Sequence, residues 1–348
     1  MSAGVQIILP GLFDLPLEEL DARFIVDDLP ALNRILGLSS ARDNKDFTVD
    51  AMLSSALNLR TLVNRSETSG AEASGAEGLA MAQACADDHQ DPRRLLLAEA
   101  IHLQADMHGA IAIPISTDST NLNDIDKIIN DLKDIFKVDC NIKSIDDGRY
   151  LLQLKQFDSP THYPHPLSIF GKSISPFIEQ SREILPWYRL VNEFQMFMYQ
   201  HPINQRRQLE GRLAINSLWV WGAGERPALD LQPLWYCDDP LLNRFASSMG
   251  LPVESCRNIV AGDDSNDAII VDLRLLQYLK SGLDWNLGEL LLDIERSILE
   301  PVLESLPRRP GPLKLRGGYH LDFELKPADR FKFWRRPGSL EIWRQATF

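Results

Sequence analysis

The chain has 348 residues, of which 44% are hydrophobic and 24% charged, the composition of an ordinary globular protein. A net charge of −13 argues against nucleic acid as the main partner, because phosphate binding needs a basic surface. The four cysteines form no Cys-x-x-Cys pair, which excludes the usual zinc and thioredoxin-like spacings. The chain has no apolar run long enough to span a membrane, and the apolar run near its start is not preceded by the basic residues of a secretory signal peptide. We therefore expect a cytoplasmic protein with reduced thiols.

The charge is unevenly distributed along the chain. The segment 308–344 carries ten basic and four acidic residues, so the rest of the chain is strongly acidic. This segment is either an arm that binds an anion or a protein partner, or a basic element that lies against an acidic body. Both interpretations stay open on the sequence alone.

Local patterns in the first half predict strands and helices in alternation. An apolar run at 5–9 ends at Pro10-Gly11 and predicts a buried strand, and helices are expected at 29–36 and 49–59. Residues 64–80 are rich in Ser, Gly, Ala and Glu and predict a mobile insert. A hairpin over 95–115, an amphipathic helix over 121–136 and a second hairpin over 138–154 follow.

The second half predicts a partly parallel sheet. An irregular, proline-rich stretch at 156–186 precedes a helix at 187–199. Strands are expected at 213–221, 234–237 and 268–273, helices at 240–249 and 287–306 (interrupted by Pro301), and antiparallel strands from 313 onward. The fold class is therefore mixed α/β, with a central mixed sheet, flanking helices and C-terminal antiparallel strands. We expect one large domain over 1–348, with a possible division into 1–155 and 156–348.

The first candidate site lies on the helix over 187–199 and just beyond it. The polar residues there are Asn192, Glu193 and Gln195, followed by His201 and Asn204. Amides and acids on a core helix are costly unless they make hydrogen bonds. They therefore form either a ligand-binding network, with His201 and Glu193 as catalytic acid or base, or a structural network that fastens the helix end. The same helix is also a possible homodimer interface.

The second candidate site is the strand that follows. Its residues Ser217, Trp219 and Trp221 share one face of the strand, and two indoles there offer a large apolar surface with polar handles. If the strand is parallel, the glycine loop after it leaves the sheet where ligands bind in open α/β sheets. A tight turn that closes over a buried indole is the alternative. The further members of this set are Asn216, Gly222 and Gly224.

His102 and Asp106 lie on one face of the first predicted hairpin and form a candidate metal site. An ordinary polar outer face of a hairpin would have the same pattern.

Residues 192–224 carry Asn-Glu-x-Gln-Met, then His-Pro-x-Asn, then Asn-Ser-x-Trp-x-Trp-Gly-x-Gly. This block, together with Ile101–Asp106 and the opening LPGLFDLPL, resembles the RpfE-type regulatory proteins of proteobacteria. The resemblance implies a frame like that of the cofactor-independent phosphoglycerate mutases of the alkaline-phosphatase superfamily. Those enzymes use a nucleophilic Ser or Thr and two divalent metals held by Asp and His clusters. The seven histidines of this chain are dispersed, and an adjacent Asp-His pair occurs once, at Asp88-His89.

Two functions remain. The leading hypothesis is a cytoplasmic regulatory or ligand-binding protein with a phosphoglycerate-mutase-like frame, which binds a small molecule or a protein partner and lacks the two-metal catalytic set. The alternative is a phosphomutase or phosphatase-like enzyme that uses Mn²⁺ or Mg²⁺. In that case His102, Asp106 and His201 would gather around Ser217 as the nucleophile.

Overall fold

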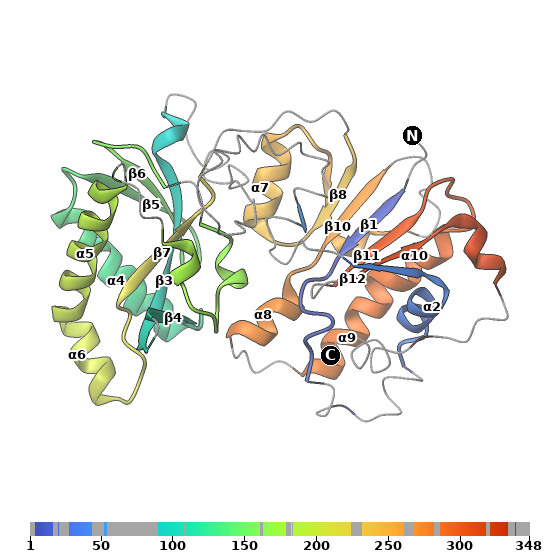
Figure 1. The fold of residues 1–348 in the computed structure, drawn as a ribbon, viewed down its shortest axis with the longest axis horizontal. Helices are drawn as coiled ribbons and strands as arrows, with labels where there is room; N and C mark the ends of the chain where they lie inside the picture. Colours follow the sequence, from blue (N-terminus) through green and yellow to red (C-terminus); the bar gives the residue numbers. More distant parts are fainter. Residues whose placement is uncertain are drawn as a thin grey trace. The chain divides into compact units, whose positions relative to one another are not determined.

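We describe the protein from a computed structural model, which covers residues 4–16, 20, 28–43, 52–53, 90–107, 109–160, 163–178, 182, 184–223, 232–260, 267–281, 286–317, 321–332 and 338. The predicted helix at 49–59, apart from residues 52–53, and the predicted insert at 64–80 lie outside these ranges. Within them, each helix is too short or too polar to cross a lipid bilayer. The chain forms two compact units (Figure 1), one from Met1–Leu59 and Ala228–Phe348 and the other from Arg60–Pro227. The boundaries therefore lie near residues 59 and 228 and not at 155.

The first unit contains a sheet of seven described strands in the order β2-β12-β11-β1-β10-β8-β9. Strands β11, β1, β10, β8 and β9 are parallel, whereas β12 and β2 extend the sheet by antiparallel pairing. This mixed sheet with antiparallel C-terminal strands confirms the predicted fold class. Its described strands are β1 (Val5–Ile8), β2 (Ser40–Asp43), β8 (Leu234–Cys237), β9 (Val253–Glu254), β10 (Ala268–Val271), β11 (Leu313–Arg316) and β12 (Leu321–Leu325).

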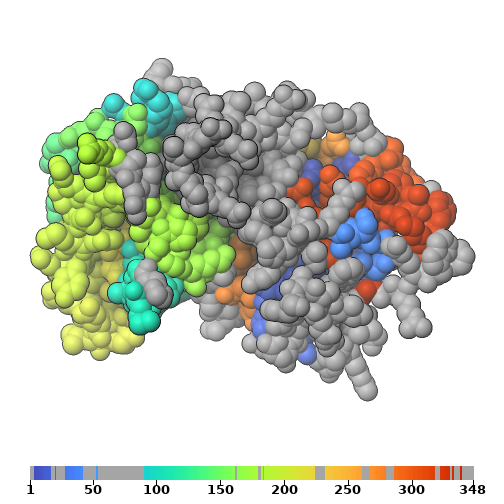
Figure 2. Space-filling view, viewed as in Figure 1, coloured from blue at the N-terminus to red at the C-terminus, as the bar shows by residue number. Residues whose placement is uncertain are grey.

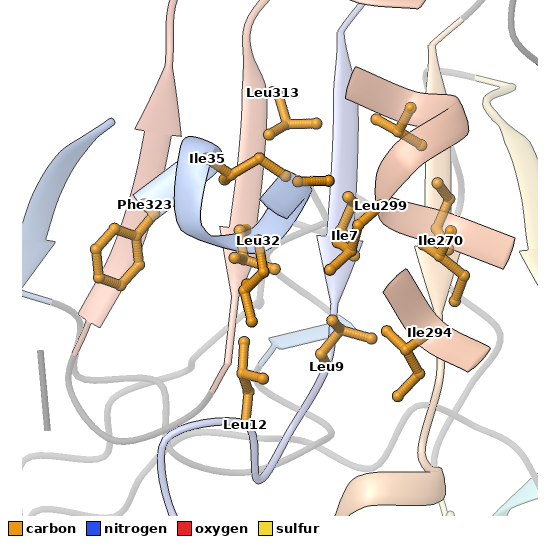
Figure 3. Close-up of a cluster of buried hydrophobic side chains, with 14 of the residues drawn as sticks. Ile7, Leu9, Leu12, Leu32, Ile35, Ile270, Ile294, Leu299, Leu313 and Phe323 are labelled. Carbon is orange, nitrogen blue, oxygen red and sulfur yellow. The ribbon is translucent and has the colours of Figure 1, made fainter. Parts of the chain in front are cut away.

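The helices of the first unit pack an apolar core on this sheet. Every residue of β10 is buried, as expected for a strand covered on both faces. Figure 3 shows Leu32 and Ile35 of one helix and Ile294 of another gathered over Ile7 of β1 and Ile270 of β10. The described helices of this unit are α2 (Pro30–Leu38), α7 (Pro240–Ser248), α8 (Arg274–Ser281), α9 (Leu287–Ile294) and α10 (Glu300–Ser305).

The long helix predicted at 287–306 is interrupted before Pro301, whereas the sequence predicted an interruption at that proline. A π-helical turn, η7 (Glu295–Leu299), joins α9 to α10, and Pro301 lies in the first turn of α10. Proline is tolerated there because the first amides of a helix have no partner within it. The irregularity therefore precedes the proline.

The second unit contains an antiparallel sheet of five described strands. The long strand β3 (Leu95–Asp106) pairs with β6 (Arg149–Leu154) over its first half and with β4 (Gly109–Pro114) over its second half. On its other edge β3 pairs with β7 (Ser217–Trp221), which is drawn alongside it in Figure 1. β5 (Cys140–Asp146) completes the sheet beside β6. Both predicted hairpins are confirmed, but β7 is antiparallel, so the glycine loop after it does not leave a parallel sheet.

Three helices accompany this sheet: α4 (Ser119–Ile135), α5 (Leu185–Gln200) and α6 (Pro202–Leu209). Asp118 is the N-cap of α4, because its carboxylate accepts a hydrogen bond from the N–H of Asn121 at 2.9 Å. The buried residues of α5, Trp187, Leu190, Phe194 and Met198, form one stripe at helical spacing. A second stripe of α5 carries the polar residues of the candidate site.

Candidate functional site

A cavity of about 960 Å³ lies wholly within the second unit. Its sides come from the sheet, from α5 and from the segment 163–178. The sheet contributes Leu103, Ala105, Gly109, Ala110, Asn216, Ser217, Leu218, Trp219 and Val220. The helix contributes Trp187, Tyr188, Val191, Asn192, Gln195, Met196, Tyr199 and Gln200. The segment contributes Tyr163, Ile174 and Ile178.

Strand alternation decides which side chains face this cavity. Ser217 pairs with Ile101 and Trp219 pairs with Glu99, so these four residues share one face of the sheet. Leu103 and Ala105, which line the cavity, continue the same face along β3. The sheet thus directs a hydroxyl and an indole from β7 toward one polar stripe of α5.

The segment 163–178 is held against the outer edge of β4. The N–H of Gly171 donates to the carbonyl of Ala112 at 2.9 Å, and the N–H of Ile174 donates to that of Ala110 at 2.9 Å. Gly109 has φ +139°, and a Cβ there would collide with the Ser175 hydroxyl. In Figure 2 the teal atoms of the β3–β4 hairpin and the light green atoms near residue 170 lie next to each other. This close approach brings Ile174 and Ile178 to the cavity.

Two polar groups in the cavity are linked to each other. The Gln195 amide donates to the Ser217 hydroxyl oxygen at 3.1 Å. Ser217 is buried, and Gln195 is half-buried on the second stripe of α5. Asn192 lies one turn earlier on that stripe and is exposed. This hydrogen bond leaves the Gln195 carbonyl as an acceptor and the Ser217 hydroxyl proton as a donor.

Aromatic side chains surround this polar pair. The Trp219 indole N–H donates to the carbonyl of Pro164 at 2.9 Å, which fixes the orientation of the ring. Tyr163 meets that ring edge-on at a centroid distance of 5.0 Å, and Phe177 does so at 6.1 Å. The hydroxyls of Tyr163 and Tyr188 are 3.5 Å apart. The cavity therefore combines oriented aromatic rings with aliphatic side chains such as Leu103, Ile174 and Val191.

The cavity lining carries no formal charge in the described part of the chain. None of the twenty lining residues is Asp, Glu, Lys, Arg or His, although such residues are common in the chain as a whole. No proton donor or acceptor that titrates near neutral pH is therefore directed into the cavity by these residues.

Five of the predicted site residues come together here: Asn192, Gln195, Asn216, Ser217 and Trp219. Asn216 lines the cavity, but its amide is used within the sheet. It accepts from the N–H of Leu103 at 2.7 Å and donates to the carbonyl of Leu103 at 2.9 Å, so it extends the β3–β7 ladder. Its contribution to the site is to hold the edge of β7 in place.

His201 and Asn204 lie outside the cavity, where α5 turns into α6. The N–H of Ile203 donates to His201 Nδ1 at 3.2 Å, so His201 caps α6. Its other nitrogen, Nε2, lies 3.1 Å from the Asp131 carboxylate on α4 and carries the proton of that bond in the neutral ring. The side-chain amide of Asn204 makes its hydrogen bonds with the backbone of Met198 and Ile215. Glu193 is exposed and does not line the cavity.

Trp221 and Gly222 do not line the cavity. Trp221 is buried and meets the His165 ring at a centroid distance of 4.3 Å. Gly222 has φ +69°, a backbone conformation that glycine adopts without a Cβ penalty. Gly224 lies outside the described residues.

His102 and Asp106 lie on the opposite face of β3 from Leu103 and Ala105. His102 Nδ1 is 2.8 Å from the carbonyl of Ala214, and Asp106 is exposed. Within the described ranges, no group of three or more His, Cys, Asp or Glu side chains is placed to hold a metal ion. The two-metal set that the family resemblance implies is therefore not assembled by these residues.

A buried carboxylate does follow a parallel strand of the first unit. Asp272 comes directly after β10 and is buried. Its oxygens accept four hydrogen bonds from the backbone and guanidinium of Arg274, at 2.6 to 3.0 Å. These hydrogen bonds help to raise the pKa of Arg274 although burial lowers it. This carboxylate is thus bound by an arginine.

A charged cluster between α4 and α6 has a structural role. Arg207 is almost fully buried and donates to Asp124 at 2.9 Å, and Arg206 donates to the same carboxylate. Burial raises the pKa of Asp124, but the hydrogen bonds from Arg207 and Arg206 outweigh it, so the pKa is lowered overall. The cluster joins α6 to α4.

Sequence reasoning missed Tyr163, Ile174, Trp187 and Tyr188 as lining residues. Tyr163 and Ile174 lie in a proline-rich stretch without periodicity, so no local pattern indicated which face they present. Trp187 and Tyr188 lie in the first turn of α5. Their helical spacing from Gln195 was the signal in the sequence that could have indicated them as lining residues.

No protein-family model matches the chain. A 2,3-bisphosphoglycerate-independent phosphoglycerate mutase from Methanosarcina barkeri is 34% identical over 80 residues, which are 23% of this chain and 20% of that protein. A probable enzyme of the same name from Geobacter sulfurreducens is 33% identical over 66 residues, 19% of this chain and 16% of that protein. The chain therefore aligns with about a fifth or less of these relatives.

Two solved structures align with most of the chain. The PH0037 protein from Pyrococcus horikoshii has a TM-score of 0.50 at 15% identity, covering 99% of this chain and 92% of that one. The cofactor-independent phosphoglycerate mutase from Thermoplasma acidophilum has a TM-score of 0.40 at 17% identity, covering 93% and 89%. The chain thus shares its mixed α/β fold with the PH0037 protein and a short stretch of sequence with the cofactor-independent phosphoglycerate mutases.

Proposed function

We propose that this protein is a cytoplasmic regulatory protein that binds a small organic molecule in the cavity of its second unit. The observation that carries the proposal is the Gln195–Ser217 hydrogen bond at 3.1 Å beside the oriented Trp219 ring, within a cavity of about 960 Å³. Ligand sites typically combine apolar, aromatic walls with a few placed polar groups. The resemblance of residues 192–224 to RpfE-type regulatory proteins covers this same site.

The rim of the cavity supports entry of a ligand from solvent. Met196 and Tyr199 of α5 line the cavity and are 64% and 73% exposed. When a ligand covers a large apolar side chain that is otherwise exposed to water, the free energy of the complex is lowered.

The cysteines support the cytoplasmic part of the proposal. Cys140, Cys237 and Cys256 are buried free thiols. Burial is the largest cause that raises the pKa of Cys140 to about 12, so this thiol stays protonated and unreactive. Unpaired thiols are typical of proteins in reducing compartments.

Binding is tested with N-phenyl-1-naphthylamine, an uncharged dye whose fluorescence rises in apolar sites. We expect Ala105→Trp to weaken dye binding at least about tenfold, because the new indole occupies the cavity. The matched control is Gln104→Trp, whose side chain lies on the other face of β3 and should leave binding unchanged. Equal binding by both variants and the wild type would show that the dye does not use this cavity, and the proposal would fail.

A metal-dependent phosphoryl-transfer enzyme is the second candidate, favoured by the two mutases that match part of the sequence. In this case Ser217 would be the nucleophile, with Mn²⁺ or Mg²⁺ as cofactor. The placement of His102 and Asp106 on the opposite face of β3 favours the first candidate. Turnover of 3-phosphoglycerate with Mn²⁺ that is lost in Ser217→Ala would instead support the enzyme.

A further inference from the structure

We infer that the ligand of this cavity is an uncharged aromatic molecule with a hydrogen-bond donor and an acceptor next to each other on one edge, as in an aromatic amide or lactam. This inference rests on the proposed function and specifies the class of ligand. Three features carry it: the absence of charge from the described lining, the oriented indole, and the polar pair formed by Gln195 and Ser217.

The lining selects against charged ligands. The described lining residues include no lysine, arginine or histidine to pair with an anion and no carboxylate to pair with a cation. Burying an ion without a partner is costly, because the lost hydration is not replaced. The net charge of the whole chain, −13, adds further repulsion against anions. The described lining therefore offers no ionic partner to a phosphate ester or a carboxylate.

The ring surface selects for a planar ligand. The Trp219 indole is held by its bond to the Pro164 carbonyl and by the edge-on Tyr163 ring, so its orientation is set before a ligand arrives. Trp187 of α5 is buried and lines the cavity as well. Rigid aromatic walls favour flat rings, because little side-chain entropy is lost on binding.

The polar pair selects for a donor and an acceptor side by side. The Gln195 amide uses one N–H on the Ser217 oxygen, which leaves its carbonyl as an acceptor. The Ser217 hydroxyl accepts that bond and keeps its own proton as a donor. A ligand edge with an N–H and a carbonyl on neighbouring atoms satisfies both groups at once. An edge without polar atoms leaves both groups unpaired on burial.

The test uses three probes of the same two-ring size: 2-quinolinone, which has the lactam edge, naphthalene, which has no polar edge, and 2-naphthoate, which is an anion. Binding to the intact chain is followed by quenching of tryptophan fluorescence. We expect 2-quinolinone to bind about tenfold more tightly than naphthalene and more tightly still than 2-naphthoate. In Gln195→Met the preference over naphthalene should fall to about one. The matched control is Gln208→Met, an exposed position on α6 outside the cavity, which should keep the wild-type preference.

Tight binding of 2-naphthoate, or a preference for 2-quinolinone that survives in Gln195→Met, would overturn the inference. The proposed function would stand in that case if Ala105→Trp still blocks the dye. If none of the three probes binds while the dye does, the ligand class is wrong and the cavity remains a binding site. If the dye also fails to bind, both proposals fall together.

Discussion

At the scale of single residues, Asn204 connects three parts of the second unit. Its amide nitrogen donates to the carbonyls of Met198 and Ile215, both at 2.7 Å, and its oxygen accepts from the N–H of Ile215 at 2.8 Å. The side chain is 1% exposed, so water cannot replace these bonds. Asn204 therefore holds the end of α5 against the chain that enters β7.

We expect Asn204→Asp to lower the free energy of unfolding by about 2 to 4 kcal/mol, because a carboxylate cannot donate to the two carbonyls and is buried beside them. Urea unfolding followed by circular dichroism measures the change. The matched control, Asn192→Asp on the exposed side of α5, should change stability by no more than about 0.5 kcal/mol. Similar losses in the two variants would contradict this role for Asn204.

At the scale of elements, a buried carboxylate links the π-helical turn η7 to the start of α2. The Glu295 side chain accepts from the N–H groups of Ala31 and Leu32, the latter at 3.1 Å, and these residues are more than 260 positions away. Burial raises the pKa of Glu295 to about 7, although both N–H groups lower it, and nearby Glu300 adds to the rise. α2 has no side chain of its own as N-cap, so Glu295 fills that role.

The burial of this carboxylate predicts a pH-dependent stability. Because the pKa is raised in the folded state, the folded protein holds the proton more tightly than the unfolded chain. The contribution of the protonated Glu295 side chain to the free energy of unfolding is fully present below about pH 4.5. It decreases as the pH rises toward 7, by roughly 3 kcal/mol in all. Glu295→Gln, which cannot ionise, should lack this decrease when unfolding is measured from pH 4 to pH 8. A parallel pH profile in wild type and variant would disprove the assignment.

Most elements were predictable because their patterns are local. The alternation around Gly109 and Gly148 predicted both hairpins, and the spacing of apolar residues predicted α4 and α5. The helix α6 was missed, because its eight residues carry few apolar positions and depend on the His201 cap and the Asp124 cluster. Such caps and ion pairs join segments that are distant in sequence.

At the scale of the whole molecule, the chain divides into two compact units with separate cores. The second unit is one continuous segment that contains the whole cavity, whereas the first is formed by the segments on either side of it. Units with separate cores can open independently, so a ligand stabilises mainly the unit that binds it.

We therefore expect 2-quinolinone or the naphthylamine dye to slow amide hydrogen exchange in β3, β7 and α5. Exchange in β1 and β10 of the first unit should change much less, which mass spectrometry of peptides from the intact chain can measure. Ala105→Trp serves as the control in which protection is lost throughout. Equal protection of both units by the ligand would place the binding site elsewhere.

The sequence by itself determined the fold class, most of the strands and helices, and the stretch of chain that holds the polar and aromatic residues. These follow from local periodicity and turn chemistry. Only the tertiary structure decided that Gln195 and Ser217 meet while His201, Asn204 and His102 are directed elsewhere. The physical reason is that a polar side chain takes its partners from distant segments, and strand pairing decides which face it occupies.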